Sequence, residues 1–155
     1  MQKIILLLFF LFLSSCGYNA IYSKKNSINY NFSINELNFI GDRDINLKMK
    51  ERLNSYTLNK ENKDFKIKIS STSSKTVAAK DTTGDATSFK NTLIINVEIS
   101  TNDRLKNSFV MSESFNYNNN SDKFSLKRYE REIKNNLAET ITDKLIFRLS
   151  NIQWY

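Results

Sequence analysis

The chain has 155 residues, of which 23 are Lys or Arg and 16 are Asp or Glu, so its formal net charge is +7. It contains no His and a single cysteine, Cys16. Without His, the commonest general base, metal ligand and triad member is absent, which argues against most hydrolytic and metal-dependent enzymes. One cysteine excludes an internal disulfide, so packing alone must hold the fold together.

Residues 1–16 have the pattern of a bacterial lipoprotein signal. Lys3 precedes an apolar run from Ile4 to Leu13, and Leu13-Ser14-Ser15-Cys16 then places small residues before the cysteine. This pattern predicts cleavage after residue 15 and a lipid on Cys16, the first residue of the mature chain. The alternatives are an ordinary signal peptide or a short membrane anchor with an incidental cysteine, but the run is far shorter than the roughly 20 residues that span a bilayer.

A lipid on Cys16 would hold the mature chain at a membrane surface, because each buried methylene contributes about 0.8 kcal/mol. In Gram-negative envelopes an Asp after the cysteine tends to retain a lipoprotein in the inner membrane, whereas this chain has Gly17. We therefore expect an outer-membrane lipoprotein that faces the periplasm.

The basic charge fits nucleic acid, anionic lipid or a phosphorylated glycolipid as a partner. However, the chain has 21 Asn and 17 Lys beside only 6 Arg, which is also what an AT-rich genome produces. Export and lipidation argue against nucleic acid, so we expect no nucleic-acid partner.

The first half of the mature chain is predicted to hold a tether, a strand and a helix. Residues 16–29 are polar and rich in Ser, Asn and Lys, which is typical of an extended tether. Apolar residues alternate from Tyr30 to Phe39 but slip near Glu36, which predicts a strand with a bulge or break. After an Asp-capped turn, helical spacing predicts an amphipathic helix from Asp44 to about Leu58.

The second half is predicted to hold three strands and a long helix. The strands are expected at Phe65 to Val77, Phe89 to Ile99 and Phe109 to Tyr117, with a small-residue turn around Gly84. Apolar residues then recur at helical spacing over six turns, after a cap at Ser121 or Asp122. They are Leu126, Tyr129, Ile133, Leu137, Ile141, Leu145 and Leu149.

Short links between the three later strands predict an antiparallel meander. Two amphipathic helices must bury their apolar stripes against one face of that sheet, which predicts an α+β two-layer sandwich in one domain, residues 30–155.

We expect no enzyme activity, cofactor or metal. The chain has no Gly-x-Ser-x-Gly elbow, no Walker loop and no Gly-x-Gly-x-x-Gly. Asp81 and Asp85 bracket Gly84, and Asp42 and Asp44 flank Arg43. Both pairs lie in turn sequences, where Asp commonly bonds its own backbone.

Three spaced motifs resemble the LPS-assembly lipoproteins (LptE) of alphaproteobacteria. Residues 16–22, Cys-Gly-Tyr-Asn-Ala-Ile-Tyr, resemble the family's Cys-Gly-aromatic-x-Pro-Leu-Tyr start, with Ala20 in place of Pro. Residues 78–89 resemble its Ala-Lys-Asp, small-residue turn and aromatic strand start. Residues 137–139 and 145–149 resemble its C-terminal helix with a closing Arg-Leu, although the polar tail of the family is missing.

The resemblance implies a fold and a function. The fold is two helices on a mainly antiparallel four-stranded sheet, with the strand at Tyr30 to Phe39 beside a later strand. The function is that of a lipoprotein subunit that plugs the outer-membrane barrel LptD, assists its folding and helps lipopolysaccharide (LPS) reach the outer leaflet. A polar, amide-rich surface suits the polar wall inside a wide barrel.

Lysines are the candidate contacts for the lipid A phosphates. Lys80 matches the family motif, while Lys90, Lys123 and Lys127 are candidates by position only. The alternative for each is an ordinary solvated surface lysine. The alternative for the whole chain is a free-standing periplasmic lipoprotein that binds a ligand in its own apolar pocket of at least about 300 Å³.

Overall fold

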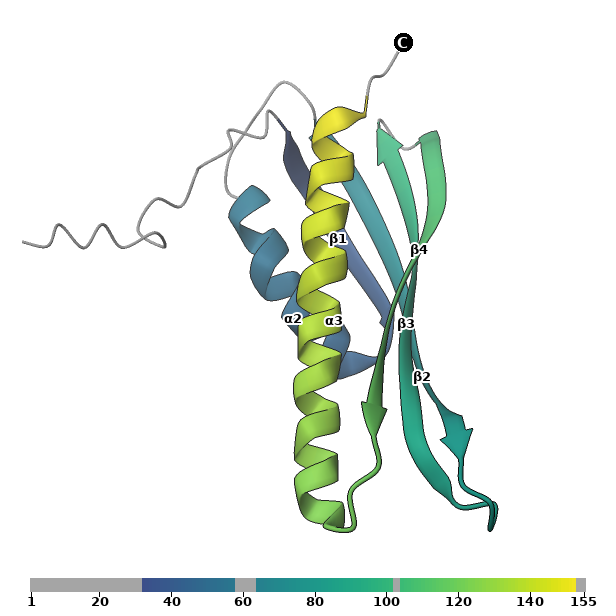
Figure 1. Cartoon of the computed structure of the whole chain (residues 1–155). Helices are drawn as coiled ribbons and strands as arrows, with labels where there is room; N and C mark the ends of the chain where they lie inside the picture. Colours follow the sequence, from purple (N-terminus) through teal and green to yellow (C-terminus); the bar gives the residue numbers. More distant parts are fainter. Residues whose placement is uncertain (1–31, 58–63, 102–103, 153–155) are drawn as a thin grey trace, which may run out of the picture. The chain divides into compact units, whose positions relative to one another are not determined.

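The computed structural model describes residues 32–57, 64–101 and 104–152, which form a sheet covered by two helices (Figure 1). Cys16, the predicted signal and the predicted tether lie outside these residues. The elements in chain order are β1 (Ser33–Gly41), α2 (Arg43–Leu53), the short 3-10 turn η2 (Asn54–Tyr56), β2 (Asp64–Lys80), β3 (Ala86–Thr101), β4 (Arg104–Asn118) and α3 (Lys123–Asn151).

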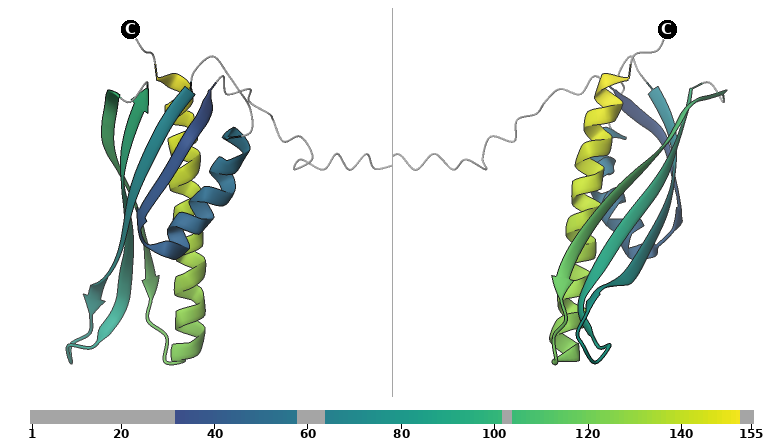
Figure 2. Two further views of the ribbon diagram at one scale, coloured as in Figure 1. Left: turned by 180° about the vertical axis from the view of Figure 1, so that it is seen from behind. Right: turned by 45° about the vertical axis from the view of Figure 1, so that its right-hand side comes forward.

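The four strands form one sheet in the order β1-β2-β3-β4. β1 pairs with β2 in parallel, and β2, β3 and β4 pair antiparallel as the predicted meander. Both helices cover the same face of the sheet (Figure 2). The predicted α+β fold is confirmed, and the helix α2 supplies the crossover that a parallel strand pair requires.

The predicted irregularity in the first strand is a β-bulge. The register between β1 and β2 shifts between Ile34 and Glu36, so that Asn35 is the extra residue. Ile34 pairs with Phe65 before the bulge and Leu37 pairs with Ile67 after it. The bulge therefore keeps the apolar residues on both sides of the slip on the helix-covered face.

The core lies between that face and the helices, and it is built from the predicted alternating and helical stripes. Its sheet side consists mainly of Phe65, Ile67, Ile69, Leu93, Ile95, Val97 and Ile99, and its helix side of Ile45, Met49, Leu53, Ile133, Leu137, Ile141, Leu145 and Leu149. Tyr129, which was predicted on the inward stripe of the last helix, is 43% exposed, and Phe115 on β4 is 46% exposed. Tyr129 lies about 100° around the helix from Glu130, the residue that faces the sheet, and this turns its ring toward the edge of the core.

Each main helix begins at an Asp cap. Asp42 Oδ1 accepts hydrogen bonds from the backbone N–H groups of Asp44 and Ile45. Asp122, rather than Ser121, does the same for α3, where it accepts from the N–H groups of Phe124 and Ser125. α2 ends at Leu53, earlier than predicted, and Leu58 lies outside the described residues. Within the described ranges, no helix has both the length and the apolar character to cross a membrane.

Gly41 sits where β1 turns into α2 and passes close to β2. Its φ is +102°, a conformation that side chains disfavour, and a Cβ atom there would overlap the carbonyl oxygen of Ser71. Gly84 in the β2–β3 turn also has a positive φ, of +94°, but no atom lies within 4 Å of where its Cβ would be. Gly41 is thus constrained by its neighbour as well as by its backbone.

We expect Gly41→Ala to lower the free energy of unfolding by about 3 kcal/mol, since it adds a clash with the β2 backbone to the backbone strain. Gly84→Ala is the matched control and is expected to cost only about 1 kcal/mol, because it adds strain alone. Chemical denaturation of both variants measures this difference, and equal losses would contradict the close approach to Ser71.

Candidate functional site

Three segments meet at one end of the molecule, which we call the distal end: the β2–β3 turn, the end of β4 and the start of α3 (Figure 1). Asn119 joins them. Its backbone N–H donates to Thr87 O at 2.8 Å, and its side-chain amide donates to Ala86 O at 2.8 Å. Its Oδ1 accepts from Lys123 Nζ at 3.3 Å. The start of the long helix is thereby tied to the hairpin formed by β2 and β3.

The β2–β3 turn satisfies its own polar groups. Asp81 Oδ1 accepts from the hydroxyl and the backbone N–H of Thr83, at 2.7 and 3.0 Å, and from the N–H of Asp85 at 2.9 Å. The hydrogen bond from the Thr83 hydroxyl, followed by that from Asp85, lowers the pKa of Asp81 below its usual value. The backbone N–H bonds to the Asp81 side chain are those of an Asx-type turn. The part of the chain that the structure describes contains no group of three or more Cys, Asp or Glu placed to hold a metal ion.

The four candidate lysines do not form one cluster. Lys80 ends β2 and pairs with Ala86 across the hairpin, so it lies at the distal end together with Lys123. Lys127 follows Lys123 one turn along α3. Lys90 lies on the opposite face of the sheet from α3, because its neighbours Phe89 and Asn91 face the helix. The geometry brings Lys80 and Lys123 to the same end and separates Lys90 from the helix lysines.

A polar network joins the sheet to α3 near the distal end. Lys75 on β2 forms an ion pair with Glu130 on α3, and its Nζ lies 3.8 Å from the centre of the Phe89 ring. The Tyr117 hydroxyl on β4 donates to Glu130 Oε1 at 2.8 Å. Glu130 thus receives bonds from two different strands, which fixes the helix against both.

The network shifts the pKa values of its members. Burial raises the pKa of Tyr117, and the bond to the Glu130 carboxylate raises it further. Burial alone would raise the pKa of Glu130, but the hydrogen bonds from Lys75 and Tyr117 outweigh it and hold that pKa below its usual value. Glu130 is therefore a carboxylate and Tyr117 a neutral phenol at neutral pH.

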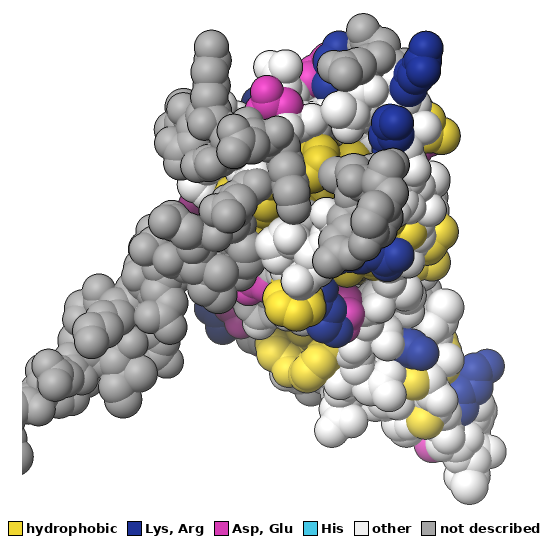
Figure 3. Space-filling view, turned by 90° about the horizontal axis from the view of Figure 1, so that it is seen from above, with side chains coloured by type: hydrophobic (Ala, Val, Ile, Leu, Met, Phe, Trp, Pro, Cys, Tyr) yellow, Lys and Arg dark blue, Asp and Glu magenta, His cyan; other side chains and the backbone are white. Residues whose placement is uncertain are grey.

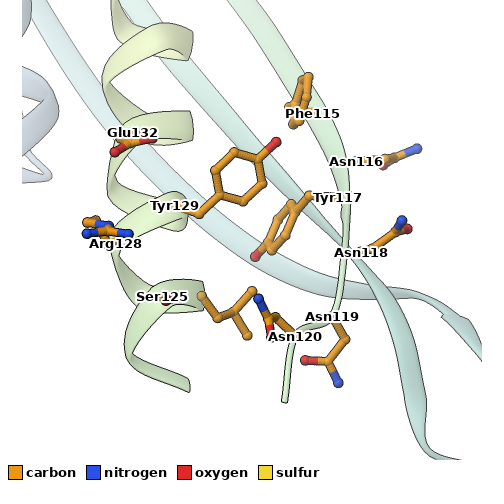
Figure 4. A pocket seen from close by; sticks show the side chains of 11 residues that line it. Phe115, Asn116, Tyr117, Asn118, Asn119, Asn120, Ser125, Arg128, Tyr129 and Glu132 are labelled. Carbon is orange, nitrogen blue, oxygen red and sulfur yellow. The ribbon is translucent and has the colours of Figure 1, made fainter. Parts of the chain in front are cut away.

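A groove of about 740 Å³ opens between the end of β4 and the first turns of α3. Tyr117 and Tyr129 line it with their rings in edge-to-face contact, 6.0 Å between centroids, and Asn119 and Asn120 close one end (Figure 4). The rest of the lining is Phe115, Asn116, Asn118, Ser125, Leu126, Arg128 and Glu132. The groove combines aromatic rings with side-chain amides, so it can accept a partner that has both apolar and hydrogen-bonding groups.

No protein-family model matches the chain, and no curated protein sequence matches it. Solved structures do match. A minor lipoprotein from Acinetobacter baumannii has a TM-score of 0.60 at 10% identity, over 78% of this chain and 91% of the other. The rare lipoprotein B from Shewanella oneidensis has a TM-score of 0.54 at 11% identity, over 76% and 98%. A lipoprotein B from Nitrosomonas europaea has a TM-score of 0.51 at 10% identity, over 78% and 86%.

The described residues thus share their fold with bacterial lipoproteins. At these identities the likeness extends to the arrangement of strands and helices and not to individual side chains.

Sequence reasoning missed the Lys75–Glu130–Tyr117 network. A signal was present, because Lys75 continues the inward-facing alternation that starts at Phe65 and passes through Ser71. A lysine at an inward position requires a carboxylate on the element that covers it.

We expect Glu130→Gln to lower the free energy of unfolding by about 1–2 kcal/mol at pH 7, because Lys75 and Tyr117 lose a charged acceptor. The pKa of Glu130 is lower in the folded protein than in the unfolded chain. The stabilisation that Glu130 gives the folded state is therefore complete above the unfolded pKa of about 4.3 and is lost as the pH falls through the folded pKa.

The difference between wild type and variant should therefore shrink as the pH is lowered below about 4. Urea titrations across pH 3–7 measure it. The control is Glu132→Gln, two residues along the same helix and exposed. A constant difference at all pH values would contradict the network.

Proposed function

We propose that this protein is a lipid-anchored outer-membrane subunit of the LPS transport machinery, which sits inside an LptD-type β-barrel, assists its assembly and helps deliver LPS to the outer leaflet. The signal ending at Cys16, the three LptE-like motifs and the fold shared with bacterial lipoproteins support the proposal.

The observation that carries it is the open face of the sheet, the face without helices. Its charges are largely paired within the face: Lys66 with Glu36 at 3.6 Å and Lys68 with Glu98 at 3.3 Å. Most other positions are hydroxyls or amides: Asn38, Ser70, Thr72, Ser74, Thr76, Thr92, Asn96, Ser100, Ser108, Ser112, Ser114, Asn116 and Asn118. Apart from Lys90 and the exposed Ile40, Ile94 and Val110, this face offers hydrogen-bonding groups and paired charges. Such a surface complements the polar inner wall of a wide barrel.

Exposed hydrophobic side chains do not gather into one large patch in the view from the opposite end of the molecule (Figure 3). In that view they are separated by polar side chains and by Lys and Arg.

The groove between β4 and α3 favours a second candidate, the free-standing ligand-binding lipoprotein. Its volume of about 740 Å³ would hold a small ligand. However, it is an open groove at the edge of the sheet, whereas Ile95, Val97 and Ile141 fill the space between sheet and helices and are fully buried.

We expect the tagged, full-length protein, purified in mild detergent from its own envelope, to carry a large outer-membrane β-barrel at one-to-one stoichiometry. Mass spectrometry and quantitative gel staining measure this. A monomer that brings no barrel would overturn the proposal and favour the ligand-binding lipoprotein.

We expect Cys16→Ala to abolish labelling with radioactive palmitate and to leave the precursor uncut, because Cys16 is both the acceptor and the cleavage-site residue. Palmitate incorporation and intact mass measure this, with Ser15→Ala as the control that retains a small residue. Lipid on the Cys16→Ala protein would contradict the lipoprotein signal.

We expect the double change Lys80→Glu and Lys123→Glu to reduce LPS bound to the purified protein by about tenfold, because both cations lie at the distal end. The control is Lys106→Glu, near the start of β4 and far from the distal end. This variant changes the net charge by half as much as the double variant does. Equal losses in both proteins would assign LPS binding to overall charge.

A further inference from the structure

The outer edge of β4 is unpaired. Within the described residues the sheet order β1-β2-β3-β4 places no strand beyond β4, which runs for 15 residues. A long edge strand presents a row of backbone N–H and C=O groups that can pair with another chain.

β4 has few of the features that usually protect an edge. The chain has no proline, and the register between β3 and β4 shifts only between Ile99 and Ser100, so β4 is regular from Asn107 onward. The only charged residue from Asn107 to Asn118 is Glu113, which is paired with Lys144 of α3. By contrast, the other edge strand, β1, has nine residues and a bulge.

The direction of the free backbone groups follows from one hydrogen bond. Asn119 N–H donates to Thr87 O, so the amide of residue 119 points toward β3. Backbone direction alternates along a strand, so the amides of Tyr117, Phe115 and Glu113 also point toward β3. The outward N–H groups therefore belong to Ser108, Val110, Ser112, Ser114, Asn116 and Asn118.

Side chains beside this edge match an added strand. A strand paired to β4 would point alternate side chains toward the helix-covered side, where Phe115, Tyr117 and Tyr129 line the groove. Its other side chains would extend the polar open face. Backbone pairing with a pocket for alternate side chains is the arrangement of β-strand addition.

We propose that the outer edge of β4 pairs with an extended segment of the barrel partner's chain, whose apolar side chains enter the groove between β4 and α3. This proposal rests on the proposed function. Charge favours the barrel over a second copy. Two copies would each carry a charge of +7, or +6 after loss of Lys3, and would repel each other, whereas the edge from Asn107 to Asn118 holds no unpaired charge that would repel a barrel segment.

The first experiment removes two outward donors. Ser112→Pro with Ser114→Pro deletes N–H groups that make no bond to β3, and proline is tolerated at such edge positions. We expect the barrel recovered with this variant to fall by about tenfold, while its thermal unfolding stays close to that of wild type. The control, Ser112→Ala with Ser114→Ala, keeps both N–H groups and should recover the barrel as wild type does.

The second experiment does not depend on how the proline variant folds. A photo-crosslinking phenylalanine analogue at Asn116 should join this protein to one extended segment of the barrel chain. The same analogue at Asn38 on β1, near the other edge of the sheet, should join it to a different part of the barrel wall. Crosslinks from Asn116 to a second copy of the chain, or to nothing while the barrel still co-purifies, would overturn the strand-addition proposal and leave the proposed function standing. Absence of the barrel from the wild-type preparation would overturn the proposed function first.

Discussion

The packing of α3 against the inward rows of β3 and β4 is the constraint on which the rest of the structure depends. No disulfide is available, and this one helix runs along the sheet beside a much shorter α2. Leu93, Ile95, Val97 and Ile99 are buried beneath it. Each such side chain contributes about 1.5–3 kcal/mol when it is fully buried. This packing also places the start of α3 beside the end of β4, where the groove and the polar network lie.

Hydrophobic contact alone would allow α3 to slide along the sheet by a turn, and the ion pairs oppose this. Lys134 bonds to Asp42 at the start of α2, and Lys48 bonds to Glu139 at 3.1 Å. Burial opposes ionisation of Asp42, yet hydrogen bonds from Ser73 and Ile45 and the charge of Lys134 hold its pKa below the usual value. Such pairs contribute little stability individually, but a shift of one turn would break several at once. They therefore specify the register of the helix.

The order of elements and most of the core could be predicted from the sequence, because period-two and helical spacing are local signals. The bulge near Glu36 could be predicted for the same reason, because the alternation of apolar residues is interrupted at that one place. What the sequence could not show is which elements approach each other from far along the chain. Lys75 and Glu130 are separated by 55 residues, and nothing local pairs them. Tyr129 was predicted inside because it continues the apolar stripe of the last helix, but it lies at the edge of the core and lines the groove beside β4. The roles of Lys80, Lys90, Lys123 and Lys127 stay predictions.

The parallel pairing of β1 has a consequence for the order in which the chain can fold. Ser33 pairs with Asp64, and Gly41 with Ser71, so β1 cannot find its partner until the whole of α2 and the start of β2 are present. The meander of β2, β3 and β4 needs only neighbouring segments, and local contacts form faster than distant ones. With the proposed lipid anchor at Cys16, the strand closest to the attachment point would thus be among the last to join the sheet.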